Sequence, residues 1–446
     1  IYARVLGPSD LGQYYFAISV TSIFSMFIDI GLSNVVTREV AKHPDEAKKL
    51  VGSVIALKLL LAVITIIALV AWTMSWNYEP LTRDLIYISA LVIIFDNFTS
   101  IFYAILRGYH NLKFESIASV LFQLIVLIVS LVVLGLDLNI RWLMGSLVAA
   151  SLFNVIYSAL MMQRVTHVSF QLSWNKSLLK QIILITLPFA LYGIFQRFYT
   201  FFDSVLLFKV AGDRAVGLYQ VPFKIIVALQ FLPMAFTASL YPALSRYWHH
   251  NKEQLQVTFE RAITYSLILG IPIMIGTIVL AEQIVLLFTH DYNDAIVPLQ
   301  IAMMAVPAMF LSFPIGSLLN ACDRQKRNTV NIMITAIASA LLNIWLIPQL
   351  NVVGACITSV LTSFLMIILG MLVVPQIIKV RLKIMSLMFL RIIGAGIIMG
   401  LVISQVKEYF HPIISVALGG IIYALALYLF KGFNKEDIKS IHASFR

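Results

Sequence analysis

Charge is scarce in this sequence, and so is cysteine. Charged residues make up 12% of the 446 positions, while 60% are hydrophobic and the mean hydropathy is +0.92. Soluble domains average about 25% charged and about 45–50% apolar residues, so a water-soluble fold is excluded. The two cysteines, Cys322 and Cys356, are too few for a disulfide framework, and they form no CxxC pair of the kind that holds a metal ion.

Enzyme motifs are also missing. The sequence has no HExxH, GxSxG, P-loop or Rossmann fingerprint, and its eight histidines are scattered. We therefore expect no catalytic residue, no metal site and no bound cofactor. The net charge of +11 could suit nucleic acid or an anionic membrane. In a chain this apolar it indicates basic cytoplasmic loops, and no nucleic-acid partner is expected.

Long apolar runs alternate with short polar breaks along the whole chain. Backbone groups inside a bilayer must be hydrogen-bonded internally, and about 20 apolar residues span it. Each run is therefore predicted to be a membrane-spanning helix. Thirteen are expected, at residues 11–36, 53–74, 84–106, 115–135, 141–162, 181–208, 215–240, 261–288, 295–320, 328–347, 353–376, 383–404 and 412–430.

Lysine and arginine are distributed unevenly between the two sides. The alternate breaks that begin with residues 37–52, together with the tail 431–446, hold 22 of the 32, against 6 in the other breaks. By the positive-inside rule the first set is cytoplasmic. This predicts a multi-pass protein of the cytoplasmic membrane with a cytoplasmic C-terminus. Residue 1 then lies outside, so one more helix is expected before it, which makes fourteen with the first missing from this chain.

A short motif recurs 205 positions apart. VLGPSDLGQY at 5–14 and VAGDRAVGLY at 210–219 match at four of ten positions. The copies lie six spans apart, and an even number of helices preserves orientation, so parallel repeats are expected. The predicted fold is all-α, with two parallel six-helix lobes of pseudo-two-fold symmetry around a central cavity plus two C-terminal helices. The expected parts are an N-terminal lobe at 1–180 with five visible spans, a C-terminal lobe at 181–376 with six, and two extra spans with a cytoplasmic tail at 377–446.

Charged side chains inside the spans are the candidates for function. Each costs about 2.5–3.5 kcal/mol at the bilayer centre, so it normally faces a cavity or a partner. Arg197 and Lys224 suggest an anionic ligand such as pyrophosphate, which Arg binds in bidentate fashion and Lys as a point charge. Helical spacing places Tyr192, Gln196, Tyr199 and Asp203 on one face. The substrate-binding candidates are Arg197, Lys224, Asp203, Gln196, Tyr199 and Lys58.

Each of these interpretations has a structural alternative. Asp29 and Asp96 are candidate coupling sites for H⁺ or another cation, whereas Arg197 and Asp203 could instead form a structural contact between lobes. Lys58 and Arg391 are close enough to the cytoplasmic edge to snorkel, which is the interpretation we favour for Arg391. The face formed by Asn328, Asn331, Thr335 and Ser339 fits helix packing as well as a cavity. Gly396-x-x-x-Gly400 favours close packing of helices.

Several stretches resemble one known family. They are ARVLGPSDLGQYYFA at 3–17, FIDIGLSNVVTREVA at 27–41, ILRGYHNLKFESIAS at 105–119 and FYTFFDSVLLFKVAGDRAVGLYQVPFKI at 198–225. They are similar to the prokaryotic polysaccharide-transporter family, the Wzx-type flippases of the multidrug/oligosaccharidyl-lipid/polysaccharide exporter superfamily. The resemblance runs over most of the chain, and its motifs mark the family better than the substrate.

The resemblance implies movement of a lipid-linked, polyprenyl-pyrophosphate oligosaccharide to the outer leaflet by alternating access. It implies that Arg197 and Lys224 hold the pyrophosphate and that Asp203 and Asp29 occupy the family's acidic positions. Membrane lipids and the glycan assembly machinery are then expected partners, while the coupling ion, H⁺ or Na⁺, stays open. A multidrug or cation antiporter, or a lipid II flippase of the same superfamily, is an alternative. A membrane glycosyltransferase or glycan polymerase is a more remote one, because its chemistry would need a larger outer loop than residues 75–83.

Overall fold

The computed structural model describes residues 5–43, 47–166 and 173–432, and every regular element in these ranges is a helix. Within them ten helices are long and apolar enough to cross a membrane, or eleven if the bent pair His290–Met303 and Val306–Ala321 forms one span. The all-α membrane fold is therefore confirmed. The chain divides into two compact units, Arg4–Gly217 and Leu218–Arg446, and each is described by itself. The lobe boundary expected at 180/181 stays a prediction.

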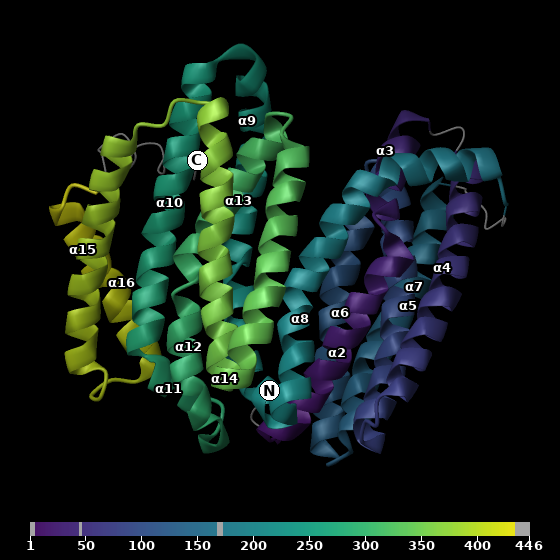
Figure 1. The fold of residues 1–446 in the computed structure, drawn as a ribbon, viewed down its shortest axis with the longest axis horizontal. Coiled ribbons are helices and arrows are strands. Elements are labelled where there is room, and N and C mark those ends of the chain that lie inside the picture. The colour runs from purple at the N-terminus through teal and green to yellow at the C-terminus, as the bar shows by residue number, and fades with distance from the viewer. Residues whose placement is uncertain (1–4, 44–46, 167–172, 433–446) are drawn as a thin grey trace. The chain divides into compact units, whose positions relative to one another are not determined.

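The N-terminal unit contains the five visible spans that the sequence predicts for its lobe, together with the first part of the next helix (Figure 1). Two of its helices begin with proline, whose missing N–H costs nothing in a first turn. The elements are α2 (Pro8–Asp29), α3 (Leu32–Lys42), α4 (Ala47–Ser75), α5 (Pro80–Gly108), α6 (Lys113–Gly135), α7 (Ile140–Thr166) and α8 (Lys176–Leu229), which continues into the other unit.

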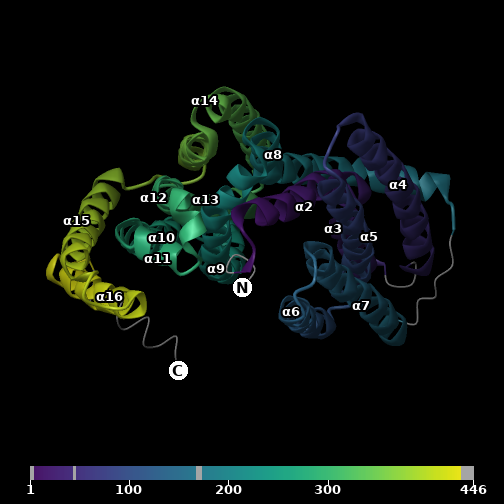
Figure 2. The same cartoon turned by 90° about the horizontal axis from the view of Figure 1, so that it is seen from below.

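The described elements of the C-terminal unit are also helices. Its helices are shown in teal, green and yellow in Figure 1, and Figure 2 shows them end-on. They are the end of α8, then α9 (Phe231–His250), α10 (Lys252–Val279), α11 (Ala281–Leu286), η2 (His290–Ala295), α12 (Ile296–Met303), α13 (Val306–Ala321), α14 (Gln325–Val373), η3 (Val374–Gln376), α15 (Leu382–Val406) and α16 (Pro412–Leu429).

Two expected outer breaks are much tighter than predicted. The sequence predicts polar loops at 209–214 and 348–352, but α8 and α14 run through them with one non-helical residue each. Gly212 has φ 81° and Asn351 has φ 49°, left-handed values that glycine and asparagine tolerate. Dividing both helices at these residues, and counting the bent pair as one span, recovers the thirteen predicted segments.

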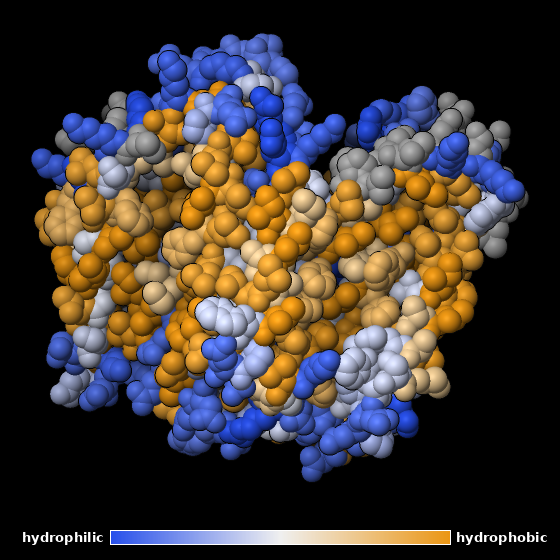
Figure 3. Space-filling model, in the orientation of Figure 1, coloured by the Kyte–Doolittle hydropathy of each residue, from blue (hydrophilic) through white to orange (hydrophobic). Residues whose placement is uncertain are grey.

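Apolar side chains cover the middle of each unit, and polar side chains gather at the two ends (Figure 3). On α6 the exposed residues include Val120, Leu124, Ile128 and Leu131. Leucine and isoleucine exposed along a whole helix face would be unfavourable in water and match the hydrocarbon of a bilayer. The protein is therefore a multi-pass membrane protein.

The two copies of the repeated motif contact one another through their glycines. A Cβ atom on Gly12 would lie 1.8 Å from the carbonyl oxygen of Asp213, and one on Gly217 would lie 1.8 Å from that of Pro8. At the offset of 205, Pro8 corresponds to Asp213 and Gly12 to Gly217. The contact is therefore reciprocal, as a two-fold relation between the copies requires. Only glycine permits this approach of the two backbones.

The last two helices, α15 and α16, pack against α10. Cβ atoms on Gly396 and Gly400 of α15 would each lie 2.7 Å from the side chain of Ile275, so the predicted close packing through Gly-x-x-x-Gly is confirmed. At one end of this contact Arg381 donates to the Glu260 carboxylate, with Nε 2.9 Å from Oε2. These hydrogen bonds raise the pKa of Arg381, so the guanidinium stays charged.

Candidate functional site

A break in the first span positions the first acidic candidate. The sequence predicts a span over 11–36, and the structure has one over Pro8–Lys42, but it is broken, because α2 ends at Asp29 and α3 begins at Leu32. Ile30 and Gly31 have φ values of 36° and 78°. Gly31 adopts the left-handed conformation without strain, so the helix can stop inside the membrane. Asp29 is consequently the last residue of a helix, where the negative end of the dipole favours cations.

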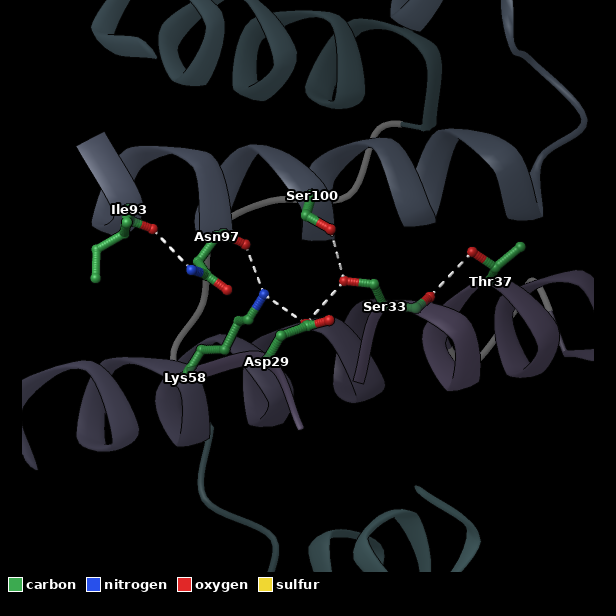
Figure 4. Close-up of polar contacts among 7 residues, drawn as sticks. All are labelled: Asp29, Ser33, Thr37, Lys58, Ile93, Asn97 and Ser100. Atoms are coloured by element: carbon green, nitrogen blue, oxygen red, sulfur yellow. Dashed lines mark hydrogen bonds and ion pairs between the residues drawn. The ribbon is translucent and has the colours of Figure 1, made fainter. Parts of the chain in front are cut away.

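Lys58 of α4 is the cation at this position. Its side chain is completely enclosed, and Nζ lies 2.9 Å from Oδ1 of Asp29. The same ammonium donates to the backbone carbonyl of Asn97 on α5, at 2.5 Å. Figure 4 shows the ammonium between the two oxygens. Because the side chain has no exposed surface, the snorkelling alternative is wrong for Lys58.

Hydroxyl groups hold the carboxylate of Asp29 from the other side (Figure 4). Ser33, in the first turn of α3, donates to Oδ1 of Asp29 at 2.9 Å, and its oxygen lies 2.8 Å from the Ser100 hydroxyl on α5. Each hydroxyl has one proton. Since Ser33 donates its proton to Asp29, Ser100 is the donor to Ser33. The carboxylate is therefore fixed by a chain of hydrogen bonds that joins α2, α3, α4 and α5.

Asp96 lies beside this group on α5. It accepts a hydrogen bond of 2.7 Å from Ser151 of α7. Arg197 on α8 is within electrostatic reach of both Asp96 and Asp29, and its side chain is exposed. Among the described residues it makes no hydrogen bond or ion pair. The N-terminal unit thus places two carboxylates, one enclosed ammonium and one accessible guanidinium in the same group of spans.

The other predicted residues of α8 lie along the same helix. Asp203 is buried and accepts from the backbone N–H of Ser204 at 2.6 Å, while Gln196 and Tyr199 are half-buried. Lys224 lies beyond the turn at Gly212, in the C-terminal unit, where its side chain is exposed and Nζ is 5.8 Å from the ring centroid of Phe223. The group around Asp29 contains Lys58, Asp96 and Arg197, all in the N-terminal unit.

Two members of the group were missed in the sequence. Asn97 contributes its backbone carbonyl, which no side-chain pattern can reveal. Ser151 lies within a run of small residues on α7 that reads as ordinary helix packing. A usable signal was present only for Ser151, a polar residue within a predicted span whose hydroxyl could reach a candidate acid.

The polar stripe of the C-terminal unit has a different character. Asn328, Asn331, Thr335 and Ser339 are all buried in the structure. Asn328 donates to the side chain of Asn320 at 3.2 Å, and Thr335 donates to the backbone of its own helix, to the carbonyl of Asn331. These contacts favour the packing interpretation of the stripe.

Comparison with known proteins gives one consistent family. The family of polysaccharide biosynthesis proteins matches residues 1–248, and the MatE family matches 188–348. The capsular polysaccharide biosynthesis protein CapF of Staphylococcus aureus is 20% identical over 82% of this chain and 91% of its own length. The probable low-salt glycan biosynthesis flippase Agl15 of Haloferax volcanii is 21% identical over 99% of this chain and 93% of its own length.

Among solved structures, the lipid II flippase MurJ in an inward closed conformation has the same fold. Its TM-score is 0.80 at 15% sequence identity, over 96% of this chain and 94% of that one. The fold agrees with the multidrug/oligosaccharidyl-lipid/polysaccharide exporter superfamily that the sequence resembles. Because the first family match covers more than half of the residues, this chain belongs to the family of polysaccharide biosynthesis proteins.

Proposed function

We propose that this protein is a flippase that moves a polyprenyl-pyrophosphate-linked oligosaccharide across the cytoplasmic membrane by alternating access. The observation that carries the proposal is Arg197, an exposed guanidinium on a membrane-spanning helix with no hydrogen-bond partner among the described residues. Asp29 and Asp96 lie within electrostatic reach of this cation but do not hydrogen-bond it, so its guanidinium can bind an anionic ligand. The names of the relatives, which include a flippase and a capsular polysaccharide protein, support a lipid-linked glycan as that ligand.

Arg197 is the residue that we assign to the pyrophosphate, because its planar guanidinium can bind two phosphate oxygens at once. Lys224, in the C-terminal unit, remains a proposed point charge for an anionic group of the substrate. Gln196, Tyr199 and Asp203, on the same helix as Arg197, would bind sugar hydroxyls. Lys58 is enclosed by Asp29 and Asn97, so we assign it to the support of Asp29 and no longer to the substrate.

Coupling to an ion remains a proposal for Asp96. Its carboxylate hydrogen-bonds a neutral hydroxyl on Ser151, and a carboxylate in that setting can accept a proton. We further propose a cytoplasmic C-terminus, a non-enzymatic role and contact with the machinery that assembles the glycan. A lipid II flippase is the second candidate, because the fold of MurJ matches almost the whole chain.

The test is leaflet transfer in vesicles that contain the purified protein and a fluorescent polyprenyl-pyrophosphate oligosaccharide. We expect transfer by the wild type, a loss of at least about tenfold in Arg197→Ala, equal to about 1.4 kcal/mol of activation free energy, and partial activity in Arg197→Lys. Arg83→Ala, in the first turn of α5, is the matched control. Vesicles with lipid II address the second candidate. Wild-type transfer in Arg197→Ala would contradict the assignment, and hydrolysis or polymerisation of the substrate would indicate an enzyme.

A further inference from the structure

The enclosed ammonium of Lys58 has no role in the proposed binding site. Its side chain has no exposed surface, so it cannot contact a substrate in this conformation. Nor does stability explain it, because an apolar pair in place of a buried ion pair is often as stable or more stable. A charged residue at such a position therefore calls for a function of the charge itself.

The atoms around the ammonium are those that bind a small metal cation. Nζ is bound by a carboxylate oxygen of Asp29 at 2.9 Å and by the backbone carbonyl of Asn97 at 2.5 Å. Carboxylate and carbonyl oxygens are the ligands of hard cations. The carboxylate is held in place by Ser33 at 2.9 Å, so its position does not depend on the ammonium alone.

The backbone provides a second argument for a cation at this position. Asp29 is the last residue of α2. The two left-handed residues that follow it, Ile30 and Gly31, break the helix inside the span. The C-terminal end of a helix has a partial negative charge, and broken helices in transporters place such ends at their ion sites. The ammonium is therefore bound where a free cation would be expected.

We infer that Asp29, the carbonyl of Asn97 and the supporting serines form a site for a small monovalent cation, and that the chain fills this site with its own ammonium, Lys58. The resident charge ties α2, α4 and α5 together without any ion from solution. It follows that wild-type protein needs no free cation at Asp29. Removal of the ammonium converts the group into a site that a free cation can occupy.

Binding is measured by thermal unfolding of the purified full chain. Lys58→Ala leaves space for a cation, whereas Lys58→Met fills the same space with an uncharged chain of similar length and is the matched control. Each protein is titrated with methylammonium chloride or NaCl, against choline chloride at equal ionic strength. We expect the unfolding temperature of Lys58→Ala to rise by about 2 °C or more with either small cation, with no rise in Lys58→Met or the wild type.

The inference is overturned if neither small cation raises the unfolding temperature of Lys58→Ala above the choline value, or if the wild type responds equally. If Lys58→Ala is not recovered in folded form, cells that express it are grown with methylammonium. A higher yield of folded protein than in Lys58→Met then supports the inference, and an unchanged yield overturns it.

A transport measurement, which rests on the proposed function, completes the test. In vesicles with the polyprenyl-pyrophosphate oligosaccharide, Lys58→Ala should transfer at least about tenfold less than the wild type, and methylammonium should restore transfer. Transfer in Lys58→Ala at the wild-type rate without added cation would overturn the inference. If the wild type itself moves no glycan, the proposed function fails, whereas the cation response in thermal unfolding is unaffected.

Discussion

The two compact units use polar side chains inside their spans in different ways. The N-terminal unit joins opposite charges there, with Lys58 enclosed against Asp29. The C-terminal unit joins neutral groups, such as Asn328 with Asn320. Of its two described ion pairs, Glu260–Arg381 ties the start of α15 to α10. A neutral hydrogen bond is sufficient to pack helices. The costlier charges of the N-terminal unit therefore indicate where substrate or ion acts.

Removal of the enclosed ammonium should have the largest effect. Lys58→Met leaves the Asp29 carboxylate without its cation, which should cost about 3–5 kcal/mol of unfolding free energy. The double variant Asp29→Asn/Lys58→Met has no charge left to solvate, so it should regain more than half of that loss. Chemical unfolding of the purified proteins checks both values. If the single and double variants are equally destabilised, the loss comes from side-chain packing and not from the unpaired charge of Asp29.

The next largest effect is expected at the contact between Gly12 and Gly217. It tests whether the two motif copies are related by a two-fold axis. A methyl group on Gly12 would collide with a backbone carbonyl, which cannot move aside as a side chain can, so Gly12→Ala should cost about 3 kcal/mol. The same loss is expected for Gly217→Ala, because the contact is reciprocal. Gly145→Ala, with no atom within 4 Å of the added carbon, is the control and should be neutral or stabilising. Unequal losses would argue against a two-fold relation.

The ion pair of the C-terminal unit should matter less. Glu260→Gln removes the charge that Arg381 binds, but the Arg381 side chain is half exposed and water can solvate it. We expect a loss of about 1 kcal/mol, smaller at high salt, with glycan transfer retained. Lys407→Gln, whose ammonium is 4.0 Å from Glu282, should show no measurable change. Loss of transfer in Glu260→Gln would give this unit a functional carboxylate in addition to Lys224.

The fold was largely predictable, because hydrophobic runs of membrane length leave the backbone no alternative to helix. The thirteen runs all became helical, and the repeated glycines marked a contact that only glycine allows. The breaks were less predictable. Ile30 takes a left-handed conformation directly before Gly31. A single glycine is common in membrane helices, so it does not by itself predict the end of α2.

The charged residues of the site could be predicted from the sequence, but which of them form an ion pair could not. Asp29, Asp96, Lys58 and Arg197 were visible as charges within spans. That Lys58 pairs with Asp29 depends on the rotation of α4 about its axis. Packing sets this rotation, and an almost uniformly apolar helix carries little periodicity to reveal it. The carbonyl of Asn97 leaves no trace in a side-chain pattern.

The smallest effect is expected for the buried amide of Asn331, and it tests whether the stripe on α14 belongs to packing or to a substrate path. No described residue accepts the hydrogens of this amide, so Asn331→Leu removes a polar group that gains nothing from burial. The unfolding free energy should be unchanged or rise by about 1 kcal/mol. In Asn328→Leu, which loses the hydrogen bond to Asn320, the unfolding free energy should instead fall by about 1 kcal/mol. If Asn331→Leu lowers glycan transfer while stability holds, the amide faces the substrate, and the stripe on α14 belongs to the substrate path and not to packing alone.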